Sequence, residues 1–228
     1  MQLSDISAYP FLQDDEIWEL SMRLLSKDIV VDGVLEEIKS KKEVYFDVVR
    51  SLRAQYAHYR NKNYKTLDGQ GVVNPLYLDH YAALMYYFSR ALFLTGTNRI
   101  ILDQIFLSIK CRAAIDLYYE IDIPSYFYPL HCYATVLGRA QYNKYFVIRQ
   151  NCTVGNNHGH YPKFGEGVVL RPHSMVLGKC CIGNNVQIAS GALVIDADIP
   201  DNSVVFGDPQ NLIIKKNAVN NIKLFFPN

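Results

Sequence analysis

Residues 164–194 read FGEGVVLRPHSMVLGKCCIGNNVQIASGALV, and an apolar residue returns at every sixth position of this stretch. The positions concerned are Phe164, Leu170, Val176, Ile182, Ile188 and Val194. Neither a helix nor an ordinary strand has a period of six residues. A hexapeptide repeat is typical of a parallel β-helix, in which each six residues form one short strand and a turn, and three such units complete a coil.

A second series with the same period precedes the first and is offset from it. Its members are Leu130, Val136, Tyr142, Ile148 and Val154. The offset indicates that a loop, residues 156–163, is inserted between the two series. We expect the repeating apolar residues to point into the β-helix, and the small residues four positions later, such as Cys152 and Cys180, to fill its corners.

The remainder of the chain predicts a second kind of structure. Apolar residues at helical spacing predict helices over residues 14–26, 34–59, 74–95 and 98–119. The sequence therefore predicts an α+β chain with three parts. These are an all-helical domain over residues 1–121, the β-helix over 122–215, to which residues 212–214 add one more strand, and a tail over 216–228.

Composition excludes several classes of function. The formal net charge is +1 and no basic cluster stands out, which argues against nucleic-acid binding. The most apolar stretches are shorter than the roughly 18–20 residues of a membrane span. The first residues lack a basic start followed by an apolar run, so we expect no signal peptide. Five cysteines, an odd number, favour a reducing compartment, and we expect a cytoplasmic protein.

His131 is the first candidate for chemistry. It directly follows a repeat position, so its side chain is expected to point outward from the coil. An outward imidazole is a candidate general base because its ordinary pKa lies near neutrality. The inserted loop holds two further histidines, His158 and His160, and loops that interrupt a solenoid often carry function.

Several segments resemble the serine acetyltransferase family. Residues 130–138 read LHCYATVLG and resemble the family motif D-H-A-T-G-I-V-I-G. Residues 148–155, IRQNCTVG, are similar to I-L-Q-S-V-T-L-G, and residues 161–168, YPKFGEGV, to H-P-K-I-x-x-G-V. Residues 198–209, DIPDNSVVFGDP, resemble the ending P-x-x-x-x-x-x-G-x-P of hexapeptide acyltransferases more broadly.

The resemblance implies a left-handed β-helix that transfers an acetyl group from acetyl-CoA to a hydroxyl. His131 would be the general base, and the acceptor oxygen would attack the thioester directly. The segments that match the family's CoA positions are Ser190, Gly191 and Ala192 for the pantetheine arm and Phe206, Gly207 and Pro209 for the adenine end. It also implies a homotrimer, or a hexamer if the helical halves pair two trimers, with no metal cofactor.

Three departures from the family pattern bear on the substrate and the site. Leu130 replaces the carboxylate that precedes the catalytic His and helps to hold the amino-acid acceptor. Tyr161 replaces the family's second His, so His160, or else His158, is the candidate for that role. The family's orienting Asp is matched only by Asp122, which lies one six-residue unit too close to His131 and serves only if the entry to the coil is irregular.

These observations favour an O-acetyltransferase whose acceptor is a sugar of a surface polysaccharide or its precursor. The alternative is a serine O-acetyltransferase of cysteine biosynthesis. A non-catalytic β-helix scaffold is a different class, and such a scaffold has no need of an outward His131. A β-helix carbonic anhydrase would hold zinc between His131, His158 and His160, but two of these lie in a loop rather than at stacked positions.

Overall fold

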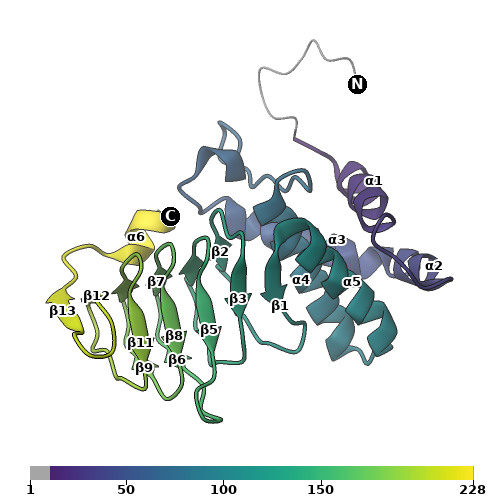
Figure 1. Cartoon of the computed structure of the whole chain (residues 1–228). Helices are drawn as coiled ribbons and strands as arrows, with labels where there is room; N and C mark the ends of the chain where they lie inside the picture. The colour runs from purple at the N-terminus through teal and green to yellow at the C-terminus, as the bar shows by residue number, and fades with distance from the viewer. Residues whose placement is uncertain (1–10, 228) are drawn as a thin grey trace.

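The computed structural model describes residues 11–227 as a helical part followed by a β-solenoid (Figure 1). Residues 1–10, where the sequence predicts the start of the helical domain and no signal peptide, lie outside the described residues. Residue 228, the last residue of the predicted tail, also lies outside them. The described chain confirms the predicted α+β organisation. The helices gather beside one end of the solenoid, and the chain runs from them into its first coil.

Five helices make up the helical part. They are α1 (Asp14–Leu25), α2 (Val34–Lys39), α3 (Lys42–Tyr56), α4 (Leu78–Leu94) and α5 (Arg99–Ala113), with a 3-10 turn η2 (Lys62–Tyr64) between α3 and α4. The predicted helix over 34–59 is divided near Ser40. Asn98 caps α5 as expected, since its side chain accepts a hydrogen bond from the Ile100 N–H at 3.0 Å. That helix ends at Ala113, earlier than predicted, because Ala114 takes a left-handed conformation with φ of 50°.

The solenoid has three faces. The first face consists of β1 (Ile115–Leu117), β3 (Thr135–Leu137), β5 (Thr153–Gly155), β8 (Met175–Leu177) and β11 (Leu193–Ile195), all parallel. The second face consists of β2 (Tyr128–Pro129), β4 (Val147–Ile148), β7 (Val169–Leu170), β10 (Gln187–Ile188), β12 (Ser203–Phe206) and the antiparallel β13 (Ile213–Lys216). The third face holds β6 (Lys163–Phe164) and β9 (Cys181–Ile182).

The repeating apolar residues form columns inside the solenoid, as predicted. On the second face Ile148 pairs with Leu170, and Leu170 pairs with Ile188. On the first face Val154 pairs with Val176, which pairs with Val194. These side chains are fully buried. Each of these short strands makes few hydrogen bonds. The burial of apolar side chains in the dry interior is therefore the main source of their stability.

The repeat fails at the beginning of the first complete coil, where the prediction for Val136 was wrong. Val136 is 42% exposed, whereas its neighbour Leu137 is fully buried and pairs with Val154. Pro129, rather than Leu130, pairs with Ile148. The chain therefore takes two more residues from Pro129 to Leu137 than from Ile148 to Val154, and this shift places Leu137 inside.

The corner between the second and first faces repeats from coil to coil. Asn151, His173 and Gly191 occupy it with φ of 57°, 62° and 73°. Asn151 N–H donates to Tyr133 O at 2.9 Å, His173 N–H to Gln150 O at 3.0 Å and Gly191 N–H to Pro172 O at 3.0 Å. The next residue is small and buried in each coil, as predicted for Cys152. These corners stack into one edge of the solenoid, which runs from His131 in the first coil to Gly207 in the last. We call it the His131 edge.

The first strand of the solenoid lies within the segment predicted as the helical domain. β1 already belongs to the first face and pairs with β3, so the sheet begins before the predicted boundary at residue 122. At the other end the predicted extra strand is present as β13, which lies antiparallel to β12. A short helix, α6 (Asn221–Phe225), then returns to the solenoid, where the Asn221 amide donates to Gly167 O at 2.8 Å.

Buried tyrosines of the helical part fasten the segment that leads into the solenoid. The Tyr59 hydroxyl donates to Phe127 O at 2.7 Å, and the Tyr64 hydroxyl donates to Pro129 O at 3.1 Å. The Tyr86 hydroxyl donates to Ile121 O at 2.5 Å. These tyrosines pack in the core and also fix the backbone that leads to His131.

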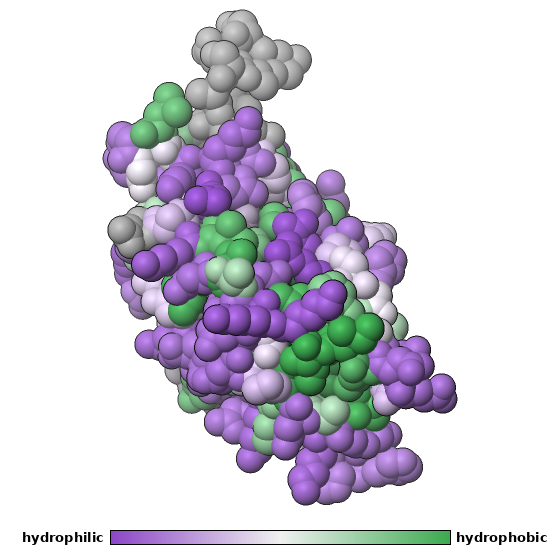
Figure 2. All heavy atoms as spheres, turned by 90° about the vertical axis from the view of Figure 1, so that its left-hand side faces the viewer, coloured by the Kyte–Doolittle hydropathy of each residue, from purple (hydrophilic) through white to green (hydrophobic). Residues whose placement is uncertain are grey.

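The surface at the C-terminal end of the solenoid carries apolar side chains. Phe206, Ile213 and Ile214 are exposed there, and Figure 2 shows an apolar patch on the side that faces this end.

Among the residues described, no helix is both long and apolar enough to cross a membrane.

The shifted register yields a first prediction. Leu137→Ala should lower the free energy of unfolding by about 2–5 kcal/mol, because it leaves a cavity in the dry interior. Val136→Ala should change it by about 0.5 kcal/mol or less, because the side chain lies at the surface. Urea denaturation of the two variants beside the wild type measures both values, and equal losses would contradict the register described here.

Candidate functional site

The segment that carries His131 is a two-residue bulge at the first turn of the His131 edge. Leu130 occupies the position of Arg149 and Arg171 in the following coils, because its N–H donates to Ile148 O at 2.9 Å. Ala134, with φ of 52°, stands three residues before Leu137, as Asn151 stands before Val154. His131 and Cys132 are therefore the two added residues. His131 has φ of 53° and its side chain is exposed, as predicted for a residue outside the coil.

Asp79, in the first turn of α4, holds this bulge. Its Oδ2 accepts from the His131 N–H at 2.8 Å, and its Oδ1 accepts from the Cys132 N–H at 3.2 Å. The Cys132 thiol donates to the same Oδ1 at 3.3 Å. These backbone N–H groups have left the regular ladder between coils, and a carboxylate satisfies both of them. A negative charge in the first turn of a helix is itself favourable.

A cavity of about 360 Å³ opens beside the bulge. Its walls come from the helical part and from the solenoid, and they include His131, Asp79, Tyr77, Asn61 and Asn63. The cavity thus presents an imidazole, a carboxylate and amides around a space large enough for a small acceptor molecule.

Two further titratable wall residues of the cavity, Cys132 and His80, are chemically quiet. Burial, reinforced by the carboxylate of Asp79, raises the pKa of the Cys132 thiol well above its usual range, so the thiol is no nucleophile. Burial lowers the pKa of His80 to about 3, and its Nδ1 accepts from the Asn74 N–H at 3.1 Å. His80 therefore stays neutral among aromatic rings, and His131 is the exposed imidazole of the cavity.

The inserted loop is a tight hairpin on a different edge of the solenoid. Asn157 and His160 exchange backbone hydrogen bonds of 3.1 and 3.0 Å, and the two residues between them, His158 and Gly159, have φ of 48° and 81°. Two central residues of positive φ are typical of the type I′ turn that closes a two-residue hairpin. His158 and His160 are both exposed.

Asp196 fixes this hairpin to the solenoid. One carboxylate oxygen accepts from the Asn157 amide at 2.6 Å and the other accepts from the Lys179 N–H at 2.6 Å. The bond from the Lys179 N–H, followed by that from Asn157, lowers the pKa of Asp196 below its usual range. The two loop histidines are thus presented from a fixed support rather than from a loose loop.

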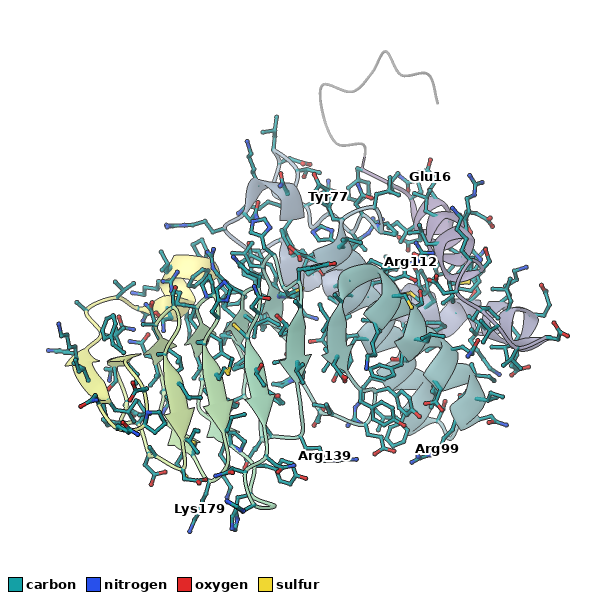
Figure 3. All side chains as sticks on the ribbon, in the orientation of Figure 1. Glu16, Tyr77, Arg99, Arg112, Arg139 and Lys179 are labelled. Atoms are coloured by element: carbon teal, nitrogen blue, oxygen red, sulfur yellow. The ribbon has the colours of Figure 1, made fainter. Side chains whose placement is uncertain are left out.

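Within one chain the structure does not bring His131 and the hairpin together. Figure 3 shows Tyr77, a wall residue of the cavity, on the opposite side of the molecule from Lys179, beside which the hairpin is held. His131 stands where the chain passes from the second face to the first, whereas the hairpin follows the end of β5 on the first face.

Asp122 pairs with a residue of the helical part. Its side chain is 83% exposed and forms an ion pair with Arg90 at 3.5 Å. In the described part of the chain the carboxylate that touches the His131 segment is Asp79, which was not among the predicted site residues. Asp79 lies within the predicted helix over residues 74–95, but no spacing in the sequence connects it to a residue so far along the chain.

The residues predicted for CoA share the His131 edge. Gly191 lies at the corner of the fourth coil, and Leu193 N–H donates to Gly207 O at 2.9 Å, which places Phe206 and Gly207 beside it on the last coil. From His131 to Gly207 the edge spans four strand spacings, roughly 19 Å. An extended molecule could lie along this edge with one end at His131.

Residues 11–227 contain no group of three or more His, Cys, Asp or Glu side chains that could hold a metal ion. His131, His158 and His160, the residues of the zinc alternative, are not gathered within one chain. A site made from all three would need more than one copy of the protein.

Comparison with solved structures identifies proteins of the same architecture. A serine acetyltransferase from Brucella abortus strain S19 aligns with a TM-score of 0.71 at 19% identity, over 91% of this chain and 85% of the other. The serine acetyltransferase of Neisseria gonorrhoeae in complex with serine aligns with a TM-score of 0.62 at 20% identity, over 83% and 81%. A serine acetyltransferase in complex with CoA aligns with a TM-score of 0.67 at 17% identity, over 88% and 85%.

The chain has the serine acetyltransferase fold. The helical region and the left-handed β-helix expected from the sequence are both found in this fold, which confirms the predicted fold class. No protein-family model matches the sequence, and no curated protein matches it either. The likeness is therefore one of three-dimensional structure.

The contact between Asp79 and the bulge yields a second prediction. Asp79→Asn should lower the free energy of unfolding by about 1–3 kcal/mol, because the amide nitrogen then faces a backbone N–H of the bulge. Urea denaturation beside Asp116→Asn, a surface carboxylate paired with Lys110, checks this. Equally small losses in the two variants would show that Asp79 does not hold the bulge.

Proposed function

We propose that this protein is an acetyl-CoA-dependent O-acetyltransferase with His131 as its general base. The observation that carries the proposal is the His131 bulge, where an exposed imidazole stands at the mouth of a cavity and at one end of the edge predicted to hold CoA. The shared fold with a serine acetyltransferase solved in complex with CoA supports the choice of donor.

The reaction follows from the position of these groups. The His131 imidazole takes the proton of the acceptor hydroxyl as the oxygen attacks the thioester carbonyl. The tetrahedral intermediate then collapses, the C–S bond breaks, and the imidazolium returns the proton to the CoA sulfur. No acyl-enzyme is needed, because a thioester is already activated, and the thiol nearest to the site, Cys132, is buried and protonated.

Serine is the acceptor that the comparisons favour over a polysaccharide sugar. The sugar was predicted because Leu130 replaces a carboxylate that helps to hold the amino acid. Asp79 supplies a carboxylate to the same cavity from α4, so the absence at residue 130 no longer argues against an amine-bearing acceptor. A sugar of a surface polysaccharide remains the competing acceptor.

A second copy of the chain is required if the hairpin assists the reaction. His160, or else His158, lies on another edge of the same solenoid, and a neighbouring solenoid in a homotrimer would bring its hairpin to the cavity. Cyclic symmetry repeats such a site three times. Pairing of the helical parts would extend the trimer to a hexamer. The five cysteines are free, which is consistent with the cytoplasm, where acetyl-CoA is consumed.

Release of CoA thiol from acetyl-CoA tests the activity and the acceptor together. The wild type should release thiol with serine and not with neutral sugars, and His131→Ala should lower kcat about 10²- to 10⁴-fold, the usual size of a general-base effect. His58→Asn, which removes an imidazole outside the cavity, is the matched control. Full activity in His131→Ala would exclude His131 as the general base. Turnover with oligosaccharides and not with serine would favour a sugar as the acceptor.

Mixing of inactive variants tests the shared site. His160→Ala should lower kcat less than His131→Ala does, and a refolded mixture of the two should recover activity above either parent, because some sites then combine two intact halves. Light scattering should give the mass of a trimer or hexamer. A monomer would exclude the shared site, and a loss confined to His158→Ala would move the role to that residue.

A further inference from the structure

A recess of about 340 Å³ lies on the second face, next to the cavity that holds His131. Its walls come from the loop after α3, from the solenoid and from α6. Three of the wall residues are arginines, namely Arg60, Arg149 and Arg171, and none is acidic. Such a concentration of one sign is unusual in a chain whose formal net charge is only +1.

Within residues 11–227 no acidic group neutralises these arginines. In the described part of the chain none of the three side chains forms an ion pair with a carboxylate. The Arg149 Nε is buried and has no hydrogen-bond partner. The Arg171 guanidinium donates to the Gln187 amide oxygen at 3.1 and 2.7 Å and lies over the Phe225 ring at 5.7 Å. A half-buried guanidinium without a carboxylate partner can bind an anionic ligand.

The solenoid itself sets Arg149 and Arg171, both half-buried, side by side. Arg149 and Arg171 each follow a residue of the paired positions Ile148 and Leu170, so their backbones are one strand spacing apart, roughly 4.8 Å. Burial, then the like charge of Arg149, lowers the pKa of Arg171. Two arginines whose backbones lie this close can both reach the oxygens of one carboxylate or phosphate group.

Two neutral groups complete the recess. Burial raises the pKa of Tyr128 to about 12, while its hydrogen bond with Asn61 and the charge of Arg149 act in the opposite direction. The Tyr128 hydroxyl therefore stays protonated beside Arg149. Asn61 is a wall residue of both the recess and the His131 cavity, and the consecutive residues Leu130 and His131 line one each.

We propose that Arg60, Arg149 and Arg171 bind a carboxylate or phosphate group of the acceptor whose hydroxyl reaches His131. This inference rests on the proposed function and adds the chemical class of the acceptor, an oxyanion-bearing molecule. The phosphates of CoA are excluded as its source by the predicted direction of CoA, whose adenine end lies near Phe206 and Gly207, on the last coil. Serine and acidic sugars both carry a suitable group.

Binding of inorganic phosphate tests the recess without any need for activity. Phosphate should raise the melting temperature of the wild type, since a ligand of the native state stabilises it. Arg149→Gln should weaken phosphate binding in calorimetry by about tenfold or more. In phosphate-free buffer the same variant should melt no lower than the wild type, because it removes an unpaired charge beside Arg171.

Arg139→Gln is the matched control, since Arg139 is an exposed arginine of the solenoid outside the recess. It should bind phosphate as the wild type does. Absence of phosphate binding in the wild type, or equal binding by Arg149→Gln and the wild type, would overturn the proposal.

Kinetics assigns the anion to the acceptor. Arg149→Gln should raise the KM for serine about tenfold or more and leave the KM for acetyl-CoA unchanged, whereas serinol, which lacks the carboxylate, should show no such difference. Glucuronic acid beside glucose is the equivalent pair for a sugar acceptor. A rise confined to the KM for acetyl-CoA would overturn the assignment to the acceptor. Phosphate binding without turnover would overturn the proposed function and leave the oxyanion site standing.

Discussion

The structure depends on the stacking of coils at one strand spacing, with an apolar column inside. Each coil must turn its corners at the same place, so the corner residues take a left-handed conformation and the residue that follows is small. The same constraint acts on the outside. Any outward position recurs directly above its equivalent in the next coil, which is why Arg149 and Arg171 meet although 21 residues separate them in the sequence. Stacked coils of this kind place side chains that can bind a ligand next to one another without any further structural element.

The bulge at His131 is the departure from this regularity on which the candidate site rests. Two added residues at a corner carry their backbone N–H groups away from the ladder, and such groups are costly unless they find another acceptor. Asp79 provides both acceptors, and the tyrosines of the helical part hold the backbone just before the bulge. The helical part is consequently a component of the site rather than an independent attachment.

The sequence predicted the solenoid well because the period of six follows from the apolar column itself. It failed at Val136, where Thr135, Val136 and Leu137 are all compatible with the interior and only the bulge decides which one enters. It also failed to find Asp79, which lies 52 residues before His131, because contacts between helix and solenoid leave no period in the sequence. His131 could be singled out because its outward position follows from the coil, whereas its supporting carboxylate depends on how two different architectures pack.

Leu130 explains how the two charged features of the site are kept apart. It is buried and takes, in the first coil, the position that Arg149 and Arg171 take in the next two, so the column of arginines ends immediately before the bulge. A third arginine at residue 130 would place its charge between Asp79 and the recess and neutralise the carboxylate. An apolar residue there leaves the carboxylate of Asp79 on the His131 side and the arginines of the recess on the other side. An acceptor with an ammonium group and a carboxylate matches both sides, whereas an acidic sugar matches only the second. The charge pattern thus supports the proposed amino-acid acceptor by a route that does not depend on the fold.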